Sequence, residues 1–438
     1  MIESYLRGFE AFSRNGGASA PAWARSLRLS AITRFGELGF PDMRNEDWHF
    51  TSVAPIAERE FAPLTSGTGH VSAEQLAPFS FGATDWHTLV FVNGRFHAEL
   101  SRTAALPDGV QVMPLARAYD ELPLLLEQHM GRIASMDAHT FTALNTAFIN
   151  DGAVVHVRQD VEVPRPIHLL FVSDADAVSG VAQPRNLIVL DRFAKATVIE
   201  SYATVARGAG AYFTNAVTEA TIGDGATLTH LKLQRESAQA YHVGTLDVRQ
   251  ARDSHLMSFS FAIGAALSRT NIYTELRGEG CGATLNGLYL GDDDQHIDHQ
   301  TRIEHVEPNC YSRELYKGIL DGASHGVFNG KVYVHPAAQK TDGKQTNNTL
   351  LLSERAQIDT KPQLEIFADD VKCTHGATVG RLNEQQRYYL QTRGIGGRTA
   401  QELLIWAFAA EVLTEVTIPE VRNGIERIVR ERLEEMLG

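Results

Sequence analysis

The stretch ATVIESYATV at residues 196–205 is rich in β-branched residues and lacks the periodicity of a helix. Comparable runs precede and follow it, among them AVVHVRQ at 153–159, IHLLFVS at 167–173 and LEIFADD at 364–370. Each run has the length and composition of a short strand, and no amphipathic helical pattern separates them. The sequence therefore predicts a continuous β domain over residues 151–380.

Aligning these runs exposes a repeat of small, polar and aliphatic triplets. The triplets begin at Ala196, Ala226, Ser254 and Ala283, at intervals of 30, 28 and 29 residues. A recurring period of this size is typical of a solenoid whose coils stack through parallel backbone hydrogen bonds. About eight coils would reach on the order of 38 Å, at ~4.8 Å per coil. A β-sandwich fits less well, because its turns would recur every 8–12 residues.

Residues 1–150 are predicted to form a mixed, largely helical region. Apolar residues recur at helical spacing in its first part and again at its end. Between these parts, WHTLVFVNGRF at 86–96 predicts a hairpin with a tight Asn-Gly turn. The segment PDMRNEDWHFTSV at 41–53 is interpreted as a loop that anchors Trp48 and Phe50 on the body of the protein.

Residues 381–438 return to helical patterns and are predicted to form a C-terminal helical domain. Asn383 is a candidate cap of its first helix, and Thr399 with Glu402 forms a candidate capping box for the second. The second helix, LLIWAFAAEVL, is apolar almost all round and is expected to be buried. The last helix carries an apolar stripe that includes Val421, Ile425 and Ile428.

The overall composition is that of an ordinary globular protein. The 438 residues carry 53 acidic and 40 basic side chains, and the net charge of −13 disfavours bulk binding to nucleic acid or anionic membranes. No apolar run approaches the ~20 residues that span a bilayer, and the first residues do not resemble a secretory signal. Three cysteines, Cys281, Cys310 and Cys373, predict free thiols in a reducing cytoplasm.

The last strands of the predicted solenoid contain a candidate pair of metal ligands. The stretch AQIDTKPQLEIFADDVKCTHGATVG covers residues 356–380, and a Lys361-Pro362 turn is expected to interrupt it. Cys373 and His375 are two residues apart, so on a strand both project from one face, about 6.5–7 Å apart. A thiolate and an imidazole suit iron, zinc or copper. Alone this signal is weak, because a free cysteine is usually a small core residue.

The densest polar cluster of the sequence lies at residues 291–310. Histidine and carboxylate side chains in such numbers are compatible with a metal site. On a strand, His296 and Asp298 would share one face and His299 would project from the other. In a solenoid, however, polar residues on outward faces stack into solvated ladders, and we prefer that interpretation. The cluster consists of His296, Asp298, His299, His305 and Cys310.

Several common catalytic motifs are absent from the sequence. Without a GxxxxGK[ST] loop the chain is not expected to bind ATP itself, and there is no GxSxG nucleophile elbow. The Gly394-Ile-Gly-Gly run lacks the preceding strand that a dinucleotide site requires. The six-residue ladder of hexapeptide acyltransferases is also missing.

Long stretches of the chain resemble the SufB/SufD family of iron–sulfur cluster assembly scaffold proteins. The resemblance runs in order through HIDHQTRIEHVEPNC at 296–310, KTDGKQTNNTLLL at 340–352, CTHGATVG at 373–380 and LLIWAFAAEVL at 403–413. PDMRNEDWHFTSV resembles the N-terminal region of the family. The CTHGATVG segment resembles the SufD branch, in which serine usually occupies the position of Thr374.

The resemblance implies a right-handed parallel β-helix and a non-enzymatic role in a complex. It implies pairing with a SufB-like paralogue through the β-helices, and a SufC-type ATPase held on the C-terminal helical region. It further implies that His375, beside Cys373, helps bind iron or a nascent iron–sulfur cluster that is transient and shared with the paralogue. Whether the isolated chain forms a homodimer stays open.

Two surfaces are predicted for these partners. The edge of the last coil, with Leu364, Ile366 and Val371, is expected to continue its hydrogen-bond ladder into the paralogue, as in β-augmentation. The C-terminal helices are expected to contact the ATPase through Leu403, Trp406, Val421, Ile425 and Ile428. The alternative function is a metal-dependent β-helix enzyme that uses the His296–His305 cluster.

Overall fold

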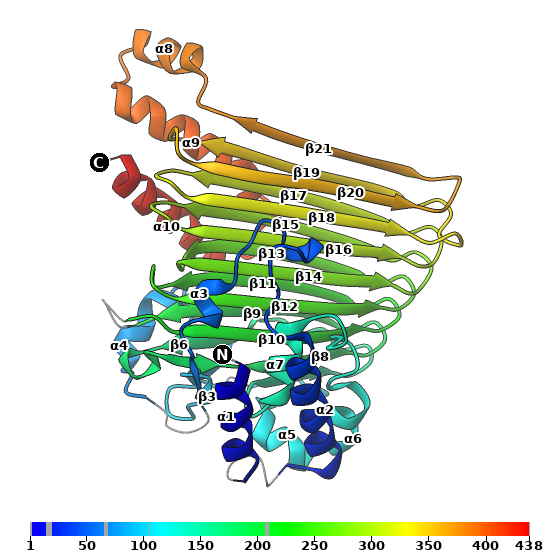
Figure 1. Ribbon diagram of the computed structural model, residues 1–438. Helices are drawn as coiled ribbons and strands as arrows, with labels where there is room; N and C mark the ends of the chain where they lie inside the picture. The colour runs from blue at the N-terminus through cyan, green and yellow to red at the C-terminus, as the bar shows by residue number, and fades with distance from the viewer. Residues whose placement is uncertain (1, 15–19, 65–68, 104, 206–209, 438) are drawn as a thin grey trace.

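The computed structural model describes residues 2–14, 20–64, 69–103, 105–205 and 210–437. Strands stack into one elongated β-solenoid, with helices at both ends of the chain (Figure 1). The predicted mainly β solenoid with helical N- and C-terminal regions is therefore confirmed. Within these ranges, no helix is both long and apolar enough to traverse a lipid bilayer.

Each coil contributes one strand to each of two sheets, and from β5–β6 to β20–β21 there are about eight coils, as predicted. The first sheet contains β4 (Val110–Pro114), β5 (Ala153–Val157), β8 (Arg185–Leu190), β10 (Phe213–Ile222), β12 (Tyr241–Gln250), β14 (Leu267–Leu276), β16 (His296–His305), β18 (His325–Val334) and β20 (Gln357–Ile366), with β1 (Ala62–Pro63) and β7 (Gly180–Ala182) beside it. The second contains β2 (His87–Val92), β3 (Arg95–Phe96), β6 (Ile167–Ser173), β9 (Lys195–Thr204), β11 (Thr227–Glu236), β13 (His255–Gly264), β15 (Gly282–Gly291), β17 (Tyr311–Leu320), β19 (Asp342–Leu351) and β21 (Lys372–Gly380).

The register between coils matches one predicted interval and corrects two. Ala226 and Ser254 precede the aligned pair Thr227 and His255, so that interval is confirmed. Ala196, however, aligns with Leu228, and Ala283 aligns with Leu256, each two residues away from the predicted partner. Because side chains alternate with a period of two, these shifts leave every residue on its predicted face.

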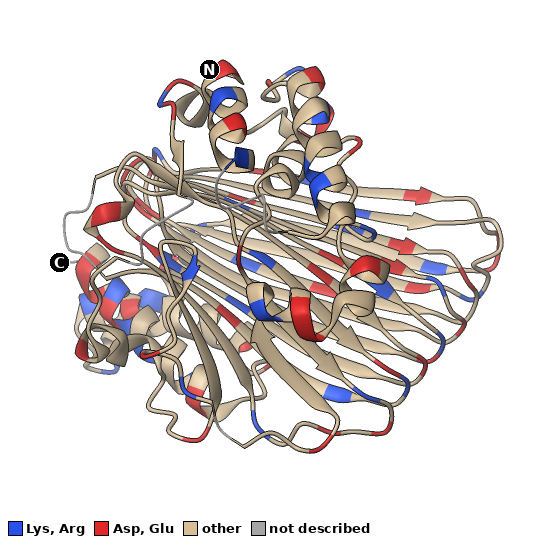
Figure 2. Ribbon diagram, turned by 90° about the horizontal axis from the view of Figure 1, so that it is seen from below, with Lys and Arg blue, Asp and Glu red and all other residues tan. Residues whose placement is uncertain are grey.

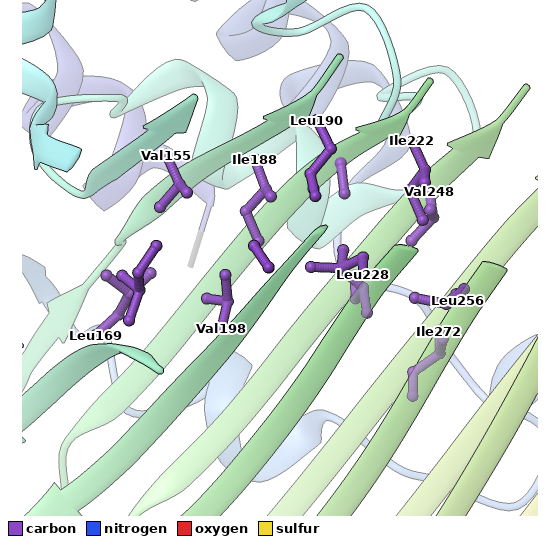
Figure 3. Close-up of a cluster of buried hydrophobic side chains, with 14 of the residues drawn as sticks. Val155, Leu169, Ile188, Leu190, Val198, Ile222, Leu228, Val248, Leu256 and Ile272 are labelled. Atoms are coloured by element: carbon purple, nitrogen blue, oxygen red, sulfur yellow. The ribbon is translucent and has the colours of Figure 1, made fainter. Parts of the chain in front are cut away.

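The space between the two sheets is filled by aliphatic side chains. Figure 3 shows Leu228, Val248, Leu256 and Ile272 directed into this space from both sheets. All four are buried, and burying each contributes roughly 1.5–3 kcal/mol to the free energy of unfolding. Apolar packing inside the coils, together with the ladders between them, therefore holds the solenoid together.

The N-terminal region packs on the first coils, and its segment 41–53 extends along the first sheet to β16. Its helices are α1 (Ile2–Arg14), α2 (Ala22–Leu38), α3 (Ala54–Ala57), α4 (Ala73–Leu76), α5 (Leu115–Glu121), α6 (Pro123–His129) and α7 (Thr140–Ala147), with short 3-10 turns η1 (Glu46–Trp48), η2 (Ala77–Phe79) and, later in the chain, η3 (Ala175–Ala177). The predicted hairpin is confirmed, because β2 and β3 pair with Val92 opposite Arg95. Asn93 and Gly94 form its turn with φ angles of 50° and 77°, as a tight hairpin requires.

The C-terminal helices are α8 (Glu384–Thr392), α9 (Gly397–Leu413) and α10 (Pro419–Leu437). Asn383 caps α8, as predicted, through its side-chain oxygen. The capping box at Thr399 is wrong: α9 begins at Gly397 after Gly396, so Thr399 already lies in the first turn. The helices α9 and α10 pack on the outer face of the second sheet, against residues such as Leu231.

The predicted Lys361-Pro362 turn is wrong. Both residues lie inside β20, aligned with Asn329 and Gly330 of β18. Proline lacks the N–H that a central strand needs, but it is tolerated in an edge strand. Among the described strands β20 pairs only with β18, so it is an edge strand.

Charged residues of both signs are interspersed over the molecule. Figure 2 shows blue and red segments alternating along the strands, turns and helices of the face in view. Many of these charges form ion pairs between neighbouring coils, such as Arg313 with Asp342 at 2.6 Å and Arg249 with Glu275 at 3.3 Å.

Candidate functional site at the open end of the solenoid

The last coil leaves both sheets with an unpaired edge. In the described part of the chain, β20 pairs only with β18 and β21 pairs only with β19. Figure 1 shows β21 as the outermost strand at the top of the solenoid, with α9 and α10 beside the sheets rather than over this end. Nearly every residue of β21 is exposed. An accessible edge of this kind can accept a strand from another chain.

Cys373 lies on β21 with its thiol turned into the solenoid. It aligns with Gly343 of β19, and a Cβ atom at Gly343 would lie 3.3 Å from the Cys373 Sγ atom. The missing side chain of Gly343 therefore makes room for the sulfur, which packs near Val332 and Val334. Burial raises the pKa of the Cys373 thiol. The free chain thus favours the protonated thiol, which is a poor metal ligand.

His375 follows two residues later on the same face of β21 and is exposed. Its aligned neighbour on β19 is Gln345. The structure therefore brings the two predicted ligands together on one strand face, with the thiol partly buried and the imidazole accessible. Their role as ligands stays a prediction. Asp370, which lies just before this pair in the sequence, forms an ion pair with Lys340.

The predicted edge residues differ in accessibility. Ile366, at the end of β20, is 37% exposed. Leu364 and Val371 are partly buried and pack with Cys373 against the core of the last coils. Ile366 is therefore the member of this set best placed to touch another chain.

The C-terminal helices correct part of the predicted ATPase contact. Val421, Ile425 and Ile428 are buried against the second sheet, so they are not available for direct contact with a partner. The apolar stripe of α10 packs this helix against the solenoid of its own chain. By contrast, Leu403 on α9 is 42% exposed, and Trp406 is partly exposed beneath Arg430, whose guanidinium lies 3.9 Å from the ring centroid. The expectation that α9 is buried all round is therefore wrong.

Sequence reasoning missed two exposed aromatic residues next to this surface. Tyr388 and Tyr389 on α8 are more than half exposed. Tyr389 also lines a groove of about 800 Å³ between α8 and α9, together with Leu404 and Phe408. The two adjacent tyrosines in the sequence of α8 were the signal from which this surface could have been predicted. Exposed tyrosine and apolar side chains around a groove are typical of protein-binding surfaces.

The His296–His305 cluster is not a solvated ladder, so the preferred interpretation is wrong. The segment 41–53 covers it: Thr51 donates to Asp298 at 2.6 Å and lies 2.9 Å from the His296 ring. His299 projects from the opposite face, as predicted, and contacts Tyr289 inside the solenoid. Burial lowers the pKa of His296 to about 4 and that of His299 to about 3, so both are neutral.

The same cluster does not assemble a metal site in the described residues. Cys310 and His305 are buried, and His305 lies 2.9 Å from the Ser312 hydroxyl. No group of three or more histidine, cysteine, aspartate or glutamate side chains in the described ranges is arranged to hold a metal ion. Among the described residues, this cluster therefore does not form the metal centre on which the alternative function depends. Trp48 is anchored as predicted, under the Arg269 guanidinium at 3.7 Å.

A buried carboxylate lies inside the solenoid below the last coil. Glu314 on β17 is 3% exposed, and its Oε2 atom accepts a hydrogen bond of 2.6 Å from the Gln345 amide. Burial raises the pKa of the Glu314 carboxyl from 4.5 to about 7. The folded chain therefore retains a proton here that the unfolded chain releases at lower pH.

This retained proton predicts how stability depends on pH. Because the folded pKa is raised, the free energy of unfolding is expected to fall as pH rises from 4.5 to 7. The Glu314→Gln variant removes the effect, so it is expected to be more stable than wild type by about 3 kcal/mol near pH 8 and equal to it near pH 4. Urea unfolding at the two pH values measures this. Glu365→Gln, at a partly exposed position, serves as the control, and an equal change in both variants would contradict the assignment.

Sequence comparisons relate the whole chain to one group of proteins. The model described as SUF system FeS cluster assembly, SufBD core domain, matches residues 171–408. The model of the SufBD protein N-terminal region matches residues 2–169. Together these matches extend from the N-terminal helices through the solenoid to α9.

Individual relatives match over nearly their full length. The iron-sulfur cluster assembly SufBD family protein slr0076 of Synechocystis is 33% identical over 410 residues, covering 92% of this chain and 89% of that protein. The iron-sulfur cluster assembly protein SufD of Escherichia coli is 34% identical over 401 residues, covering 91% and 90%. SufD of Bacillus subtilis is 28% identical over 441 residues, covering 98% of each chain.

Proposed function

Because this chain belongs to the SufBD family of iron–sulfur cluster assembly proteins, we propose that it is a non-catalytic scaffold subunit on which a nascent cluster is built. The observation that carries this proposal is the open last coil, which presents His375 beside an unpaired strand edge. The cluster is cargo, transient and shared with a partner. The three free cysteines support a reducing, cytoplasmic setting.

The proposed first partner is a SufB-like paralogue that docks on the edge of the last coil. Backbone groups along β20 and β21 can extend their ladders into a second chain. Ile366 contributes an exposed apolar side chain at this edge. Docking here would bring ligands of the paralogue next to His375, which completes a site that two residues of one chain cannot form alone. A homodimer would use the same edge when the paralogue is absent.

The proposed second partner is a SufC-type ATPase on the α8–α9 surface. This surface combines the exposed Leu403, Tyr388 and Tyr389 with the groove between the two helices. The hydrolysis of ATP is assigned to that partner, since this sequence has no phosphate-binding loop. Packing of α9 against β15 and β17 would connect the docked ATPase mechanically to the solenoid.

Co-expression with both partners tests this proposal. We expect the tagged chain to retain the paralogue and the ATPase through size-exclusion chromatography. Ile366→Lys is expected to weaken retention of the paralogue about tenfold or more, because a buried interface cannot accommodate an unpaired charge. Leu403→Asp is expected to lose the ATPase while retaining the paralogue.

A matched control distinguishes these effects from unfolding. Phe193→Lys changes an exposed apolar residue at the other end of the solenoid and is expected to leave both partners bound. Retention of the paralogue by Ile366→Lys at low concentration would reject this edge. Loss of both partners in all three variants would indicate a folding defect instead.

A further inference from the structure

A column of polar side chains inside the last coils ends beneath His375. The strand registers align Glu314 with Gln345 and Gln345 with His375 on β17, β19 and β21. Parallel neighbours of this kind are about 4.8 Å apart and share one face. Gln345 is 1% exposed, whereas His375 is exposed. The column therefore connects the buried interior of the solenoid with its open end.

The amide of Gln345 is held in one orientation. Its Nε2 atom donates to the Glu314 carboxylate at 2.6 Å. The amide occupies space left by Gly330 of β18, where an added Cβ atom would overlap Nε2. In this hydrogen bond the amide nitrogen of Gln345 faces Glu314, so the amide oxygen faces away from it.

That amide oxygen is buried and has no hydrogen-bond partner among the described residues. A buried acceptor without a donor is unfavourable. In the next coil, His375 aligns with Gln345, and Pro362 aligns with Gly330. Proline has no N–H to offer. The imidazole of His375 carries an N–H donor and lies next to Gln345 on the neighbouring strand.

We propose that Gln345, anchored by Glu314, is a positioning residue that accepts a hydrogen bond from one ring nitrogen of His375 and leaves the other nitrogen free for iron. The inference rests on the proposed function, in which His375 is a ligand of the nascent cluster. In protein metal sites the nitrogen of a histidine that does not bind metal commonly donates to an outer partner, and this bond fixes the tautomer. Asp370 does not take this role, because it is engaged with Lys340.

The tautomer of His375 tests the inference without any iron. The full chain is labelled with ring-¹⁵N histidine and measured at about pH 8. Comparison with the spectrum of His375→Ala identifies the His375 signals. Wild type is expected to show one tautomer, and Gln345→Leu the mixture of a free imidazole. Glu314→Leu is expected to resemble Gln345→Leu, whereas Glu314→Gln keeps an acceptor for the amide and is expected to resemble wild type.

Two further variants separate positioning from a general effect on the strand. Asn348→Leu removes an amide from the opposite face of β19, where it accepts a hydrogen bond from Thr378 of β21 at 2.6 Å. This control is expected to leave the tautomer unchanged. Gly330→Ala displaces the Gln345 amide without altering either polar residue, and it is expected to release the tautomer.

Cobalt(II) alone provides a second measurement. We expect Gln345→Leu to lower the affinity of the chain for Co²⁺ about tenfold, and Asn348→Leu to leave it unchanged. A mixed tautomer in wild type, or a single tautomer that persists in Gln345→Leu, overturns the inference. A fixed tautomer in a complex that never retains iron through His375 leaves the positioning intact and rejects the proposed function.

Discussion

Replacing Asp298 with alanine is expected to lower the free energy of unfolding by about 3–5 kcal/mol. Asp298 is fully buried and pairs with the buried guanidinium of Arg269 at 2.7 Å. Thr51 and Gln300 donate to the same carboxylate, each at 2.6 Å. Its removal would leave the buried guanidinium of Arg269 without its acidic partner, which is the costly way to break an ion pair.

Urea unfolding of the variants measures this effect, and two comparisons control it. Asp359→Ala removes a carboxylate two coils away that is 40% exposed and pairs with His325, so we expect a loss below about 1 kcal/mol. Replacing Arg269 and Asp298 together by methionine and leucine is expected to restore most of the stability lost in Asp298→Ala. Equal losses in Asp298→Ala and Asp359→Ala would show that burial of the pair is not the cause.

The same residue shows where sequence reasoning reached its limit. Strand alternation correctly placed His296 and Asp298 on one face and His299 on the other, because the period of a strand is local. Whether that face meets solvent depends on the segment 41–53, which is distant in sequence and returns to cover it. The resulting burial reverses the interpretation of the cluster, although the faces predicted for these three residues are correct.

The fold itself was predictable because each coil repeats the same local pattern. The two errors in coil register did no harm, since both amount to two residues and preserve the faces. The error at Pro362 arises from the position of the strand in its sheet and not from the local pattern. Proline is a turn signal in most sequences, but an edge strand tolerates it, and edge position follows from the end of the repeat.

The candidate site was only half predictable. Cys373 and His375 are close in sequence, so their shared face could be predicted. Gln345 lies beside His375 one coil earlier, and only the register between β19 and β21 reveals it. The apolar stripe containing Val421 packs within the chain, but the pattern of such a stripe cannot distinguish a contact within the chain from one between chains.

Substituting His375 by alanine is expected to reduce the iron retained by the assembled complex to near background. The imidazole is exposed at the open edge, where the paralogue is proposed to dock, and neutral imidazole can replace thiolate in some iron–sulfur centres. Cys373→Ala is expected to have the smaller effect. The Cys373 thiol occupies the space above Gly343. Burial raises the pKa of this thiol, which disfavours the thiolate.

The measurement is anaerobic reconstitution of the purified complex with ferrous iron and sulfide, followed by visible absorption and iron analysis. Each variant must first retain both partners, so that a lost cluster reports on the ligand and not on assembly. Thr374→Ala is the matched control, because its exposed side chain lies between the two candidates on the opposite face of β21. Normal cluster formation by His375→Ala together with loss in Cys373→Ala would reverse the assignment. Normal formation by both would make this strand a structural edge, and the ligands would then have to come from the paralogue alone.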